Sequence, residues 1–201
     1  MPSAIKRTML CLLLCATLLL PEARQASAAP ELEGFDLKSR KIAENCAAEI
    51  IEQFELLLTG GHLTIAQLFD TFYIPIPGTD PQKFHTQYDE LTDGILRPIL
   101  DKYLKADSRF IFVVAVDRNG YLPTHNSKYS QPMTDDNDYN TKRNRTKRIF
   151  NDRTGLAAAR NKEPYLLQRY SRDTGEIMTD LSVPIIIKKR HWGAVRIGYK
   201  K

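Results

Sequence analysis

The chain has 201 residues, of which 26% are charged, and its 29 Lys and Arg against 24 Asp and Glu give a net charge of +5. The basic residues are spread along the chain without a tract or an aromatic-basic stripe, whereas a nucleic-acid-binding protein concentrates them in one footprint. Nucleic acid is therefore not an expected partner. The length suits a single domain with a substantial core.

The N-terminus has the order of parts found in a secretory signal peptide. Lys6 and Arg7 precede a nearly unbroken apolar run from residue 9 to residue 20, and the small-residue sequence Ala26-Ser27-Ala28 follows. This pattern predicts a signal peptide over residues 1–28, cut after Ala28, and a periplasmic mature protein. The alternative is an uncleaved membrane anchor, but a spanning helix needs about 20 apolar residues.

One cysteine, Cys46, remains after that cut, so we expect no internal disulfide.

A long helix is predicted from Asp36 to Leu58, ending at Gly60-Gly61, because apolar residues recur at helical spacing. These are Leu37, Ile42, Cys46, Ile50, Phe54 and Leu57. We interpret residues 29–61 as a stalk or docking helix, which could form a homodimer, and residues 62–201 as the domain proper.

The rest of the first half predicts short helices and an ordered loop. Thr64 can cap a short helix, and three prolines and a glycine between Tyr73 and Phe84 exclude regular structure there. A further helix is predicted from Asp89 to Leu104, interrupted near Pro98.

The second half is rich in strand signals. The sequence FIFVVAV at 110–116 is followed by Asn119-Gly120, a strong hairpin signal, with YLPTHN at 121–126 as the return strand. Residues 136–150 are predicted to form a helix or helical crossover. Three more strands are expected at 165–172, 176–187 and 192–200. The fold class is α+β, with an antiparallel five-stranded sheet.

Several motifs in order carry a family resemblance: IPIPGT, DRNGYLPTHN, NRTKRIFNDRTG, RDTGE, DLSVPI and RHWGAVRIGY. Together they resemble the periplasmic PAS-like or single Cache sensor region of methyl-accepting chemotaxis proteins, over about residues 42–199. The resemblance implies an exported ligand-sensing domain. No HAMP-like or signalling segment follows the motifs, so we expect any signal to pass through a membrane receptor or a histidine kinase.

Polar residues on the predicted strands and crossover are candidate contacts for a small polar molecule or anion. His125 and Asn126 can donate to a carboxylate, or they can cap the turn into the next segment. Arg145 and Arg148 would share one face of a helical crossover, and the guanidinium fork suits small oxyanions. Equally, these arginines can be solvated and paired with the acidic residues at 135–138.

Asp180 should share a strand face with Met178 and Ser182, because side chains alternate along a strand. It can receive an amine or form a structural pair with Arg196. Tyr121 and Tyr170 can wall a small-ligand site or simply belong to the core.

We expect neither catalysis nor a resident cofactor. No nucleophile motif is present, Cys46 sits on an apolar helical face, and the four histidines have no paired metal-ligand spacing. Covalent haem needs CxxCH and is excluded. Non-covalent haem through His62, His85, His125 or His191 stays open. The functional expectation is a ligand-binding sensor module, and the alternative is a structural adaptor or receptor remnant that binds nothing.

Overall fold

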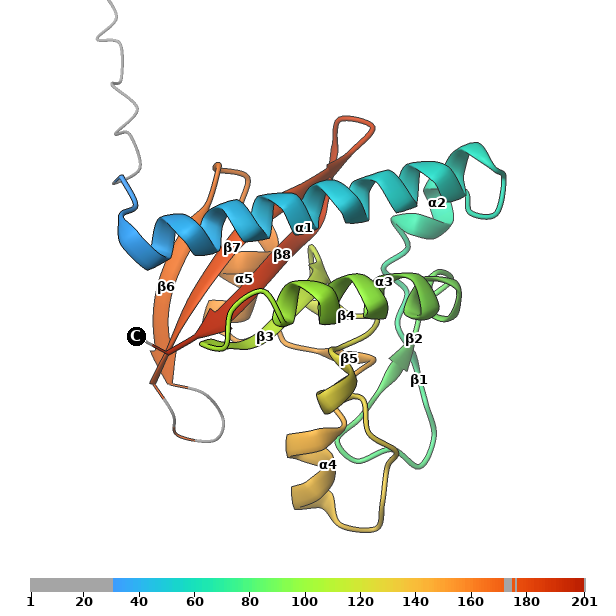
Figure 1. Ribbon diagram of the computed structural model, residues 1–201. Helices are drawn as coiled ribbons and strands as arrows, with labels where there is room; N and C mark the ends of the chain where they lie inside the picture. The colour runs from blue at the N-terminus through green and yellow to red at the C-terminus, as the bar shows by residue number, and fades with distance from the viewer. Residues whose placement is uncertain (1–30, 172–174, 176, 201) are drawn as a thin grey trace, which may run out of the picture. The chain divides into compact units, whose positions relative to one another are not determined.

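Helices from the first half of the chain cover one face of an antiparallel sheet built from the second half (Figure 1). The computed structural model describes residues 31–171, 175 and 177–200. The predicted signal peptide, the last residue of the strand expected at 165–172 and the first residue of the strand expected at 176–187 lie outside the described residues. The compact unit runs from Leu32 to Lys201 and includes the long helix.

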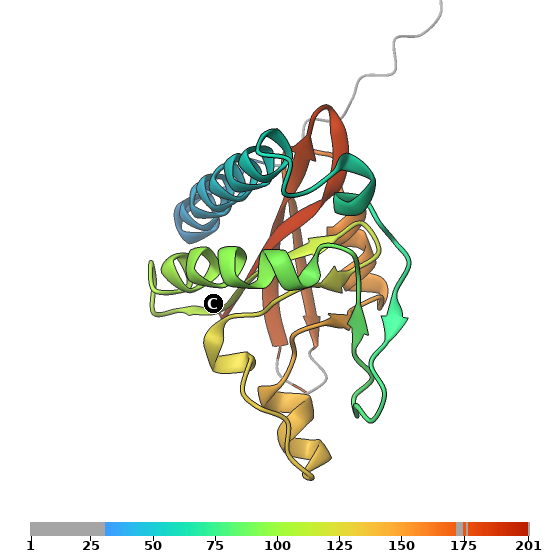
Figure 2. The same ribbon diagram turned by 90° about the vertical axis from the view of Figure 1, so that its right-hand side faces the viewer.

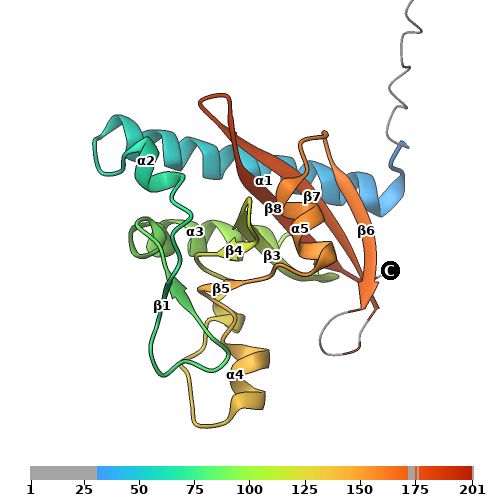
Figure 3. The ribbon, with the colours of Figure 1, turned by 180° about the vertical axis from the view of Figure 1, so that it is seen from behind.

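The sheet has four strands in the order β3-β8-β7-β6, all antiparallel neighbours. These strands are β3 (Phe110–Asp117), β6 (Leu166–Ser171), β7 (Ile177–Ile187) and β8 (Arg190–Tyr199). Helices α1 (Gly34–Thr59) and α3 (Asp89–Leu104) lie on one face, and α5 (Arg153–Arg160) lies on the other (Figures 2 and 3).

The smaller elements connect these layers. They are α2 (Ile65–Leu68), β1 (Ile74–Pro75), β2 (Phe84–His85), β4 (Tyr121–Leu122), the 3₁₀ turn η1 (Ser127–Tyr129), α4 (Asn137–Arg143) and β5 (Arg148–Ile149). Thr64 caps α2 as predicted, with a reciprocal bond to Gln67.

The long helix forms where the apolar spacing predicted it and ends at Gly60. Its inner side chains, including Cys46, Ile50 and Phe54, are fully buried against the sheet. Its outer face is mostly polar, and the exposed large apolar side chains on it are Leu37 and Leu56. The apolar stripe is therefore occupied by the sheet, and the expected homodimer through this helix stays a prediction.

Side chains alternate across β7 as predicted. Leu181 and Val183 join the main core under α1, whereas Met178 belongs to a second cluster on the α5 face with Phe112 and Ala159. Trp192, at the start of β8, is buried. Its indole Nε1 donates to the main-chain oxygen of Leu68 at 2.9 Å.

The predicted fifth strand does not join the sheet. The chain turns at Asn119-Gly120, but the Asp117 carboxylate accepts the main-chain N–H groups of Asn119 and Tyr121 at 2.9 and 3.0 Å and redirects the return segment. That segment, β4, pairs with β5 instead of β3. The open edge of β3 is satisfied by a side chain, because Val113 N–H donates to Asn126 Oδ1 at 2.9 Å.

Two helix predictions were also wrong in part. The crossover is helical only over α4, since Lys147 adopts a positive φ of 60° and the segment beyond Asn144 is extended to pair with β4. Helix α5, capped by Asp152, was not predicted. In α3 the helix continues through Pro98 without the expected interruption. The loop at 73–84 is ordered as expected, but its ends pair as β1 and β2.

Among the described residues, no helix is long and apolar enough to cross a membrane.

Candidate functional site

A cavity of about 480 Å³ lies on the α5 face of the sheet. Strands β3, β6 and β8 form its floor, and the extended segment from 145 to 152, with the start of α5, forms its other wall. The lining residues are Phe112, Val114, Leu122, His125, Arg145, Arg148, Ile149, Phe150, Asn151, Asp152, Thr154, Tyr170, Ser171 and Arg196. The wall is therefore partly aromatic and partly cationic.

Two of the three lining arginines are arranged around Phe150. The guanidinium carbons of Arg145 and Arg148 lie 5.0 and 5.1 Å from the centre of that ring. Both Nη1 groups donate to the Thr141 main-chain oxygen, at 3.0 and 3.4 Å. Stacking on an aromatic face and a shared acceptor hold both planar groups at the cavity wall.

The third arginine, Arg196, forms a buried ion pair with Asp180 across β8 and β7. Arg196 Nε donates to Asp180 Oδ2 at 2.9 Å, and Nη2 donates to the same oxygen. Burial alone would lower the pKa of Arg196, but Asp180 reverses this and holds it above its ordinary value. Arg196 is therefore charged, although only 6% exposed. Asp180 Oδ1 has no hydrogen-bond partner among the described residues.

His125 presents a defined nitrogen to the site. Its Nδ1 accepts the main-chain N–H of Asn126 at 2.7 Å, so the neutral ring carries its proton on Nε2. The ring packs edge-on against Tyr129, with centroids 4.7 Å apart. His125 is buried and lines the cavity, where an Nε2–H group is a hydrogen-bond donor.

The one carboxylate in the described lining belongs to Asp152, and it already has a structural role. Its Oδ1 accepts the N–H groups of Thr154 and Gly155 at 2.9 and 3.0 Å and so caps α5. The described lining therefore combines three guanidinium groups with this one carboxylate, and guanidinium groups are well suited to receive the oxygens of an anion.

The cavity gathers four of the seven residues proposed from the sequence: His125, Arg145, Arg148 and Tyr170. The expected helical spacing of the two arginines was wrong, yet the extended segment brings both to Phe150. None of the acidic residues at 135–138 forms the ion pair with Arg145 or Arg148 that the alternative required, within the part of the chain that is described. Asp136 instead caps α4.

The other three proposed residues do not line the cavity. Tyr121 is fully buried in the α1-side core, and its hydroxyl donates to Phe84 O at 2.8 Å. Asn126 closes the edge of β3. Asp180 lies behind Arg196 as its structural partner, one of the two roles considered for it.

Sequence reasoning missed Phe112, Phe150 and Asp152 as wall residues. Asp152 carried a usable signal, since an Asp that stands just before a run of helix-forming residues, here Leu-Ala-Ala-Ala at 156–159, is typical of a helix start. Phe112 and Phe150 carried none, because their place depends on β4 leaving the sheet.

Cys46 is buried, and burial raises the pKa of its thiol, so the expectation of an unreactive core thiol agrees with its surroundings. No group of three His, Cys, Asp or Glu side chains within residues 31–171, 175 and 177–200 could hold a metal ion.

Comparison with known proteins leaves the family open. No protein-family model matches the chain, and no curated protein matches it. Among solved structures, an extracellular ligand binding receptor from Desulfohalobium retbaense DSM5692 is similar with a TM-score of 0.37 and 13% identity. The match covers 79% of this chain and 24% of that receptor. A likeness this weak carries no argument about function.

Proposed function

We propose that this chain is an exported sensor domain that binds a small carboxylate-bearing ligand in the cavity on the α5 face. The observation that carries the proposal is the convergence of Arg145, Arg148 and Arg196 with His125 on one partly enclosed space of about 480 Å³. Guanidinium groups are the natural partners of carboxylate oxygens. The rings of Phe112, Phe150 and Tyr170 supply the apolar wall that small-ligand sites need.

An empty or collapsed pocket would favour the adaptor alternative, and the open cavity of about 480 Å³ speaks against collapse. The finer parts of the proposal rest on the sequence alone, namely on the motif resemblance and the signal-peptide pattern. These are the Cache-type assignment, the periplasmic location, and signalling through a membrane receptor or histidine kinase. Non-covalent haem is the less favoured occupant of this cavity, because the Asn126 N–H bond to His125 Nδ1 places the ring proton on Nε2, the nitrogen that would have to ligate the iron.

A thermal-shift screen tests the proposal. The chain is melted with organic acids, amino acids and amines, after an absorbance scan for bound haem. A ligand at a hundred times its Kd stabilises a protein by about 2.7 kcal/mol, which such a screen detects. We expect carboxylates to raise the melting temperature and amines without a carboxylate to leave it unchanged.

A matched pair of variants then places the ligand. Arg148→Gln removes one guanidinium from the wall, whereas Arg143→Gln removes one from the exposed last turn of α4, outside the cavity. We expect the first to weaken binding about tenfold or more, since a charge-assisted bond contributes about 1.5–3 kcal/mol, and the second to have no effect. Equal effects of the two variants, or no carboxylate that shifts melting, would refute the proposal.

A further inference from the structure

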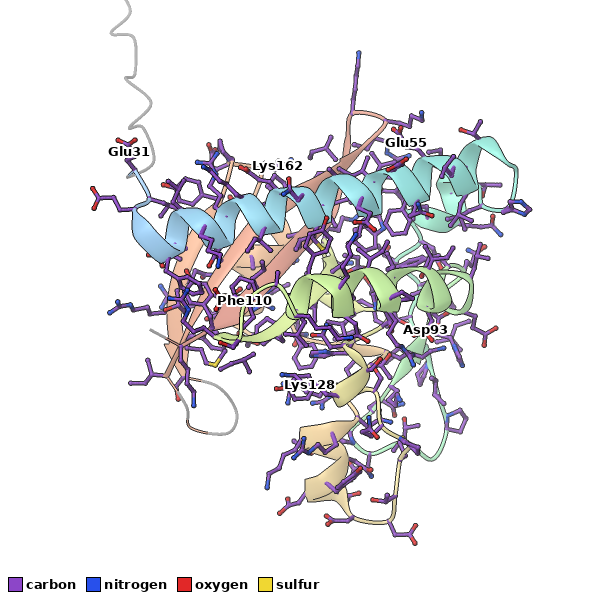
Figure 4. The ribbon with its side chains drawn as sticks, viewed as in Figure 1. Glu31, Glu55, Asp93, Phe110, Lys128 and Lys162 are labelled. Carbon is purple, nitrogen blue, oxygen red and sulfur yellow. The ribbon has the colours of Figure 1, made fainter. Side chains whose placement is uncertain are left out.

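A second hollow, separate from the cavity, lies at the end of the sheet where β3 stops and β8 starts. Its volume is about 560 Å³, and its lining residues are Phe69, Arg118, Asn119, Arg160, Lys162, Arg190 and His191. The register places the residues that follow β3 beside the start of β8, because Asp117 pairs with Gly193 and Ile187 with Arg190 at this end. Lys162 lies on the segment between α5 and β6, at the same end of the sheet as Glu55 (Figure 4). We call this hollow the basic groove.

The four cations of the basic groove have no anionic partner among the residues that the structure describes. No carboxylate stands in the described lining of the groove. None of Arg118, Arg160, Lys162 and Arg190 forms an ion pair anywhere in the described ranges, 31–171, 175 and 177–200. By contrast, many other cations of the unit are paired; the nearby Lys188, for example, lies 3.5 Å from Glu55 Oε1. Four like charges gathered without a counter-charge repel one another, and an anion placed among them relieves that repulsion.

Two of the guanidinium groups are also held in place before any ligand arrives. Arg190 lies over the ring of Phe69, with its guanidinium carbon 4.1 Å from the centroid. Arg160 Nε donates to the main-chain oxygen of Arg118 at 3.4 Å. Planar groups held in this way lose less freedom when they bind oxygens, and they bind them in a bidentate manner.

We propose that the basic groove binds a phosphoryl group. A carboxylate would neutralise only one of the four charges, whereas a phosphate monoester carries about −1.5 to −2 charges and three strong acceptor oxygens. This proposal goes beyond the proposed function and does not depend on it. The two hollows share no lining residue and lie at opposite ends of α5, where Thr154 lines the cavity and Arg160 lines the groove.

Isothermal titration of the 201-residue chain with inorganic phosphate at low ionic strength tests the proposal. The test variant is Arg118→Gln/Arg190→Gln, which removes two groove cations. The matched control is Lys41→Gln/Lys142→Gln, which removes two exposed cations elsewhere. All four side chains are exposed, so both variants should fold, as circular dichroism verifies. We expect the Kd for phosphate to rise about tenfold or more in the first and less than about twofold in the second.

His191 provides a readout inside the groove. Burial lowers the pKa of His191, and the charges of Lys162 and Arg118 act in the same direction, against a main-chain bond to Asn161. Arg160 and Arg190 line the groove with it. A bound dianion offsets these charges, so saturating phosphate should raise the pKa of His191. The pKa is measured by NMR titration, and the His191→Gln variant identifies the signal that belongs to His191. An unchanged pKa at saturation would overturn the proposal.

Vesicles separate the two possible sources of the phosphoryl group. Phosphatidylcholine vesicles containing phosphatidic acid are sedimented with the chain and with both double variants. Binding of vesicles that is lost in Arg118→Gln/Arg190→Gln supports a lipid headgroup. Binding of inorganic phosphate alone, lost in the same variant, supports a soluble phosphate ester. If neither probe binds, or if the test and control variants bind alike, the basic groove is not a phosphoryl site.

Discussion

Removal of Asp180 with Arg196 kept in place is expected to destabilise the fold strongly. In Asp180→Ala the buried guanidinium, 6% exposed, loses the oxygen that both Nε and Nη2 contact. Breaking a buried pair by removing one partner costs about 3–5 kcal/mol. For a domain of this size each kcal/mol lowers Tm by about 2–4 °C, so the expected decrease is about 6–20 °C.

The double variant Asp180→Leu/Arg196→Met separates the charge effect from packing. Replacing both partners with apolar side chains of similar volume is often neutral or stabilising. We therefore expect the double variant to unfold at a free energy close to that of the original chain, although each single change is costly. The free energies of unfolding of the original chain, Asp180→Ala and the double variant are measured by urea unfolding. The signal is the fluorescence of Trp192, which is the chain's one tryptophan and is buried.

Two results would refute this reasoning. A cost below about 1 kcal/mol for Asp180→Ala would be that of an exposed ion pair. A double variant as unstable as Asp180→Ala would show that side-chain shape, and not the unpaired charge, sets the loss of unfolding free energy. The same double variant also tests the site, because a folded domain without Arg196 should lose the thermal shift given by carboxylates.

Three smaller predictions concern other elements. Asn126→Ala should cost about 1–3 kcal/mol in urea unfolding, because Val113 N–H loses its acceptor; a neutral result would mean that β3's edge is satisfied otherwise. Gly198→Ala should cost about 1–3 kcal/mol by overpacking and abolish the ligand's thermal shift, since the added Cβ would lie 2.2 Å from the Phe112 ring at the cavity wall; an unchanged shift would contradict this. Burial would raise the pKa of Asp89, but bonds from neighbouring basic side chains hold it below its ordinary 3.8. Its stabilisation is therefore present above that pH and lost as the pH falls through the folded-state pKa, and Asp89→Asn should flatten the acid limb of urea-unfolding stability against pH.

The elements that could be predicted are those whose side-chain pattern is local. The long helix, α3 and the four sheet strands follow from apolar spacing and β-branched runs, which act within one element. The position of β4 could not be predicted in this way. It depends on one carboxylate, that of Asp117, capturing two main-chain N–H groups, and on the φ of 60° at Lys147 that lets β5 meet it.

The two hollows likewise depend on contacts between distant segments, which a local side-chain pattern does not predict. Arg145 and Arg148 were chosen for a helical face that does not exist, and they still meet because Phe150 and Thr141 O attract both. The basic groove had no signal at all in the sequence. Its cations stand at 118, 160, 162 and 190, so a count of charge along the chain shows an even spread. The register of the sheet brings Arg118 and Arg190 to one end, and the end of α5 brings Arg160 and Lys162 there.

Both proposals depend on how closely α5 lies against the sheet. The residues that α5 buries are small, namely Gly155, Ala158 and Ala159. A Cβ at Gly155 would lie 2.2 Å from the main-chain oxygen of Phe150, so the start of α5 also lies close to the segment that precedes it. A close-lying short helix cannot cover the strands beyond its two ends, so a hollow is left at each. Packing alone would account for the hollows. Packing would not account for the four cations of the basic groove, because water could fill an exposed groove and these like charges have no ion-pair partner among the described residues. A bound anion at this end of α5 would account for them.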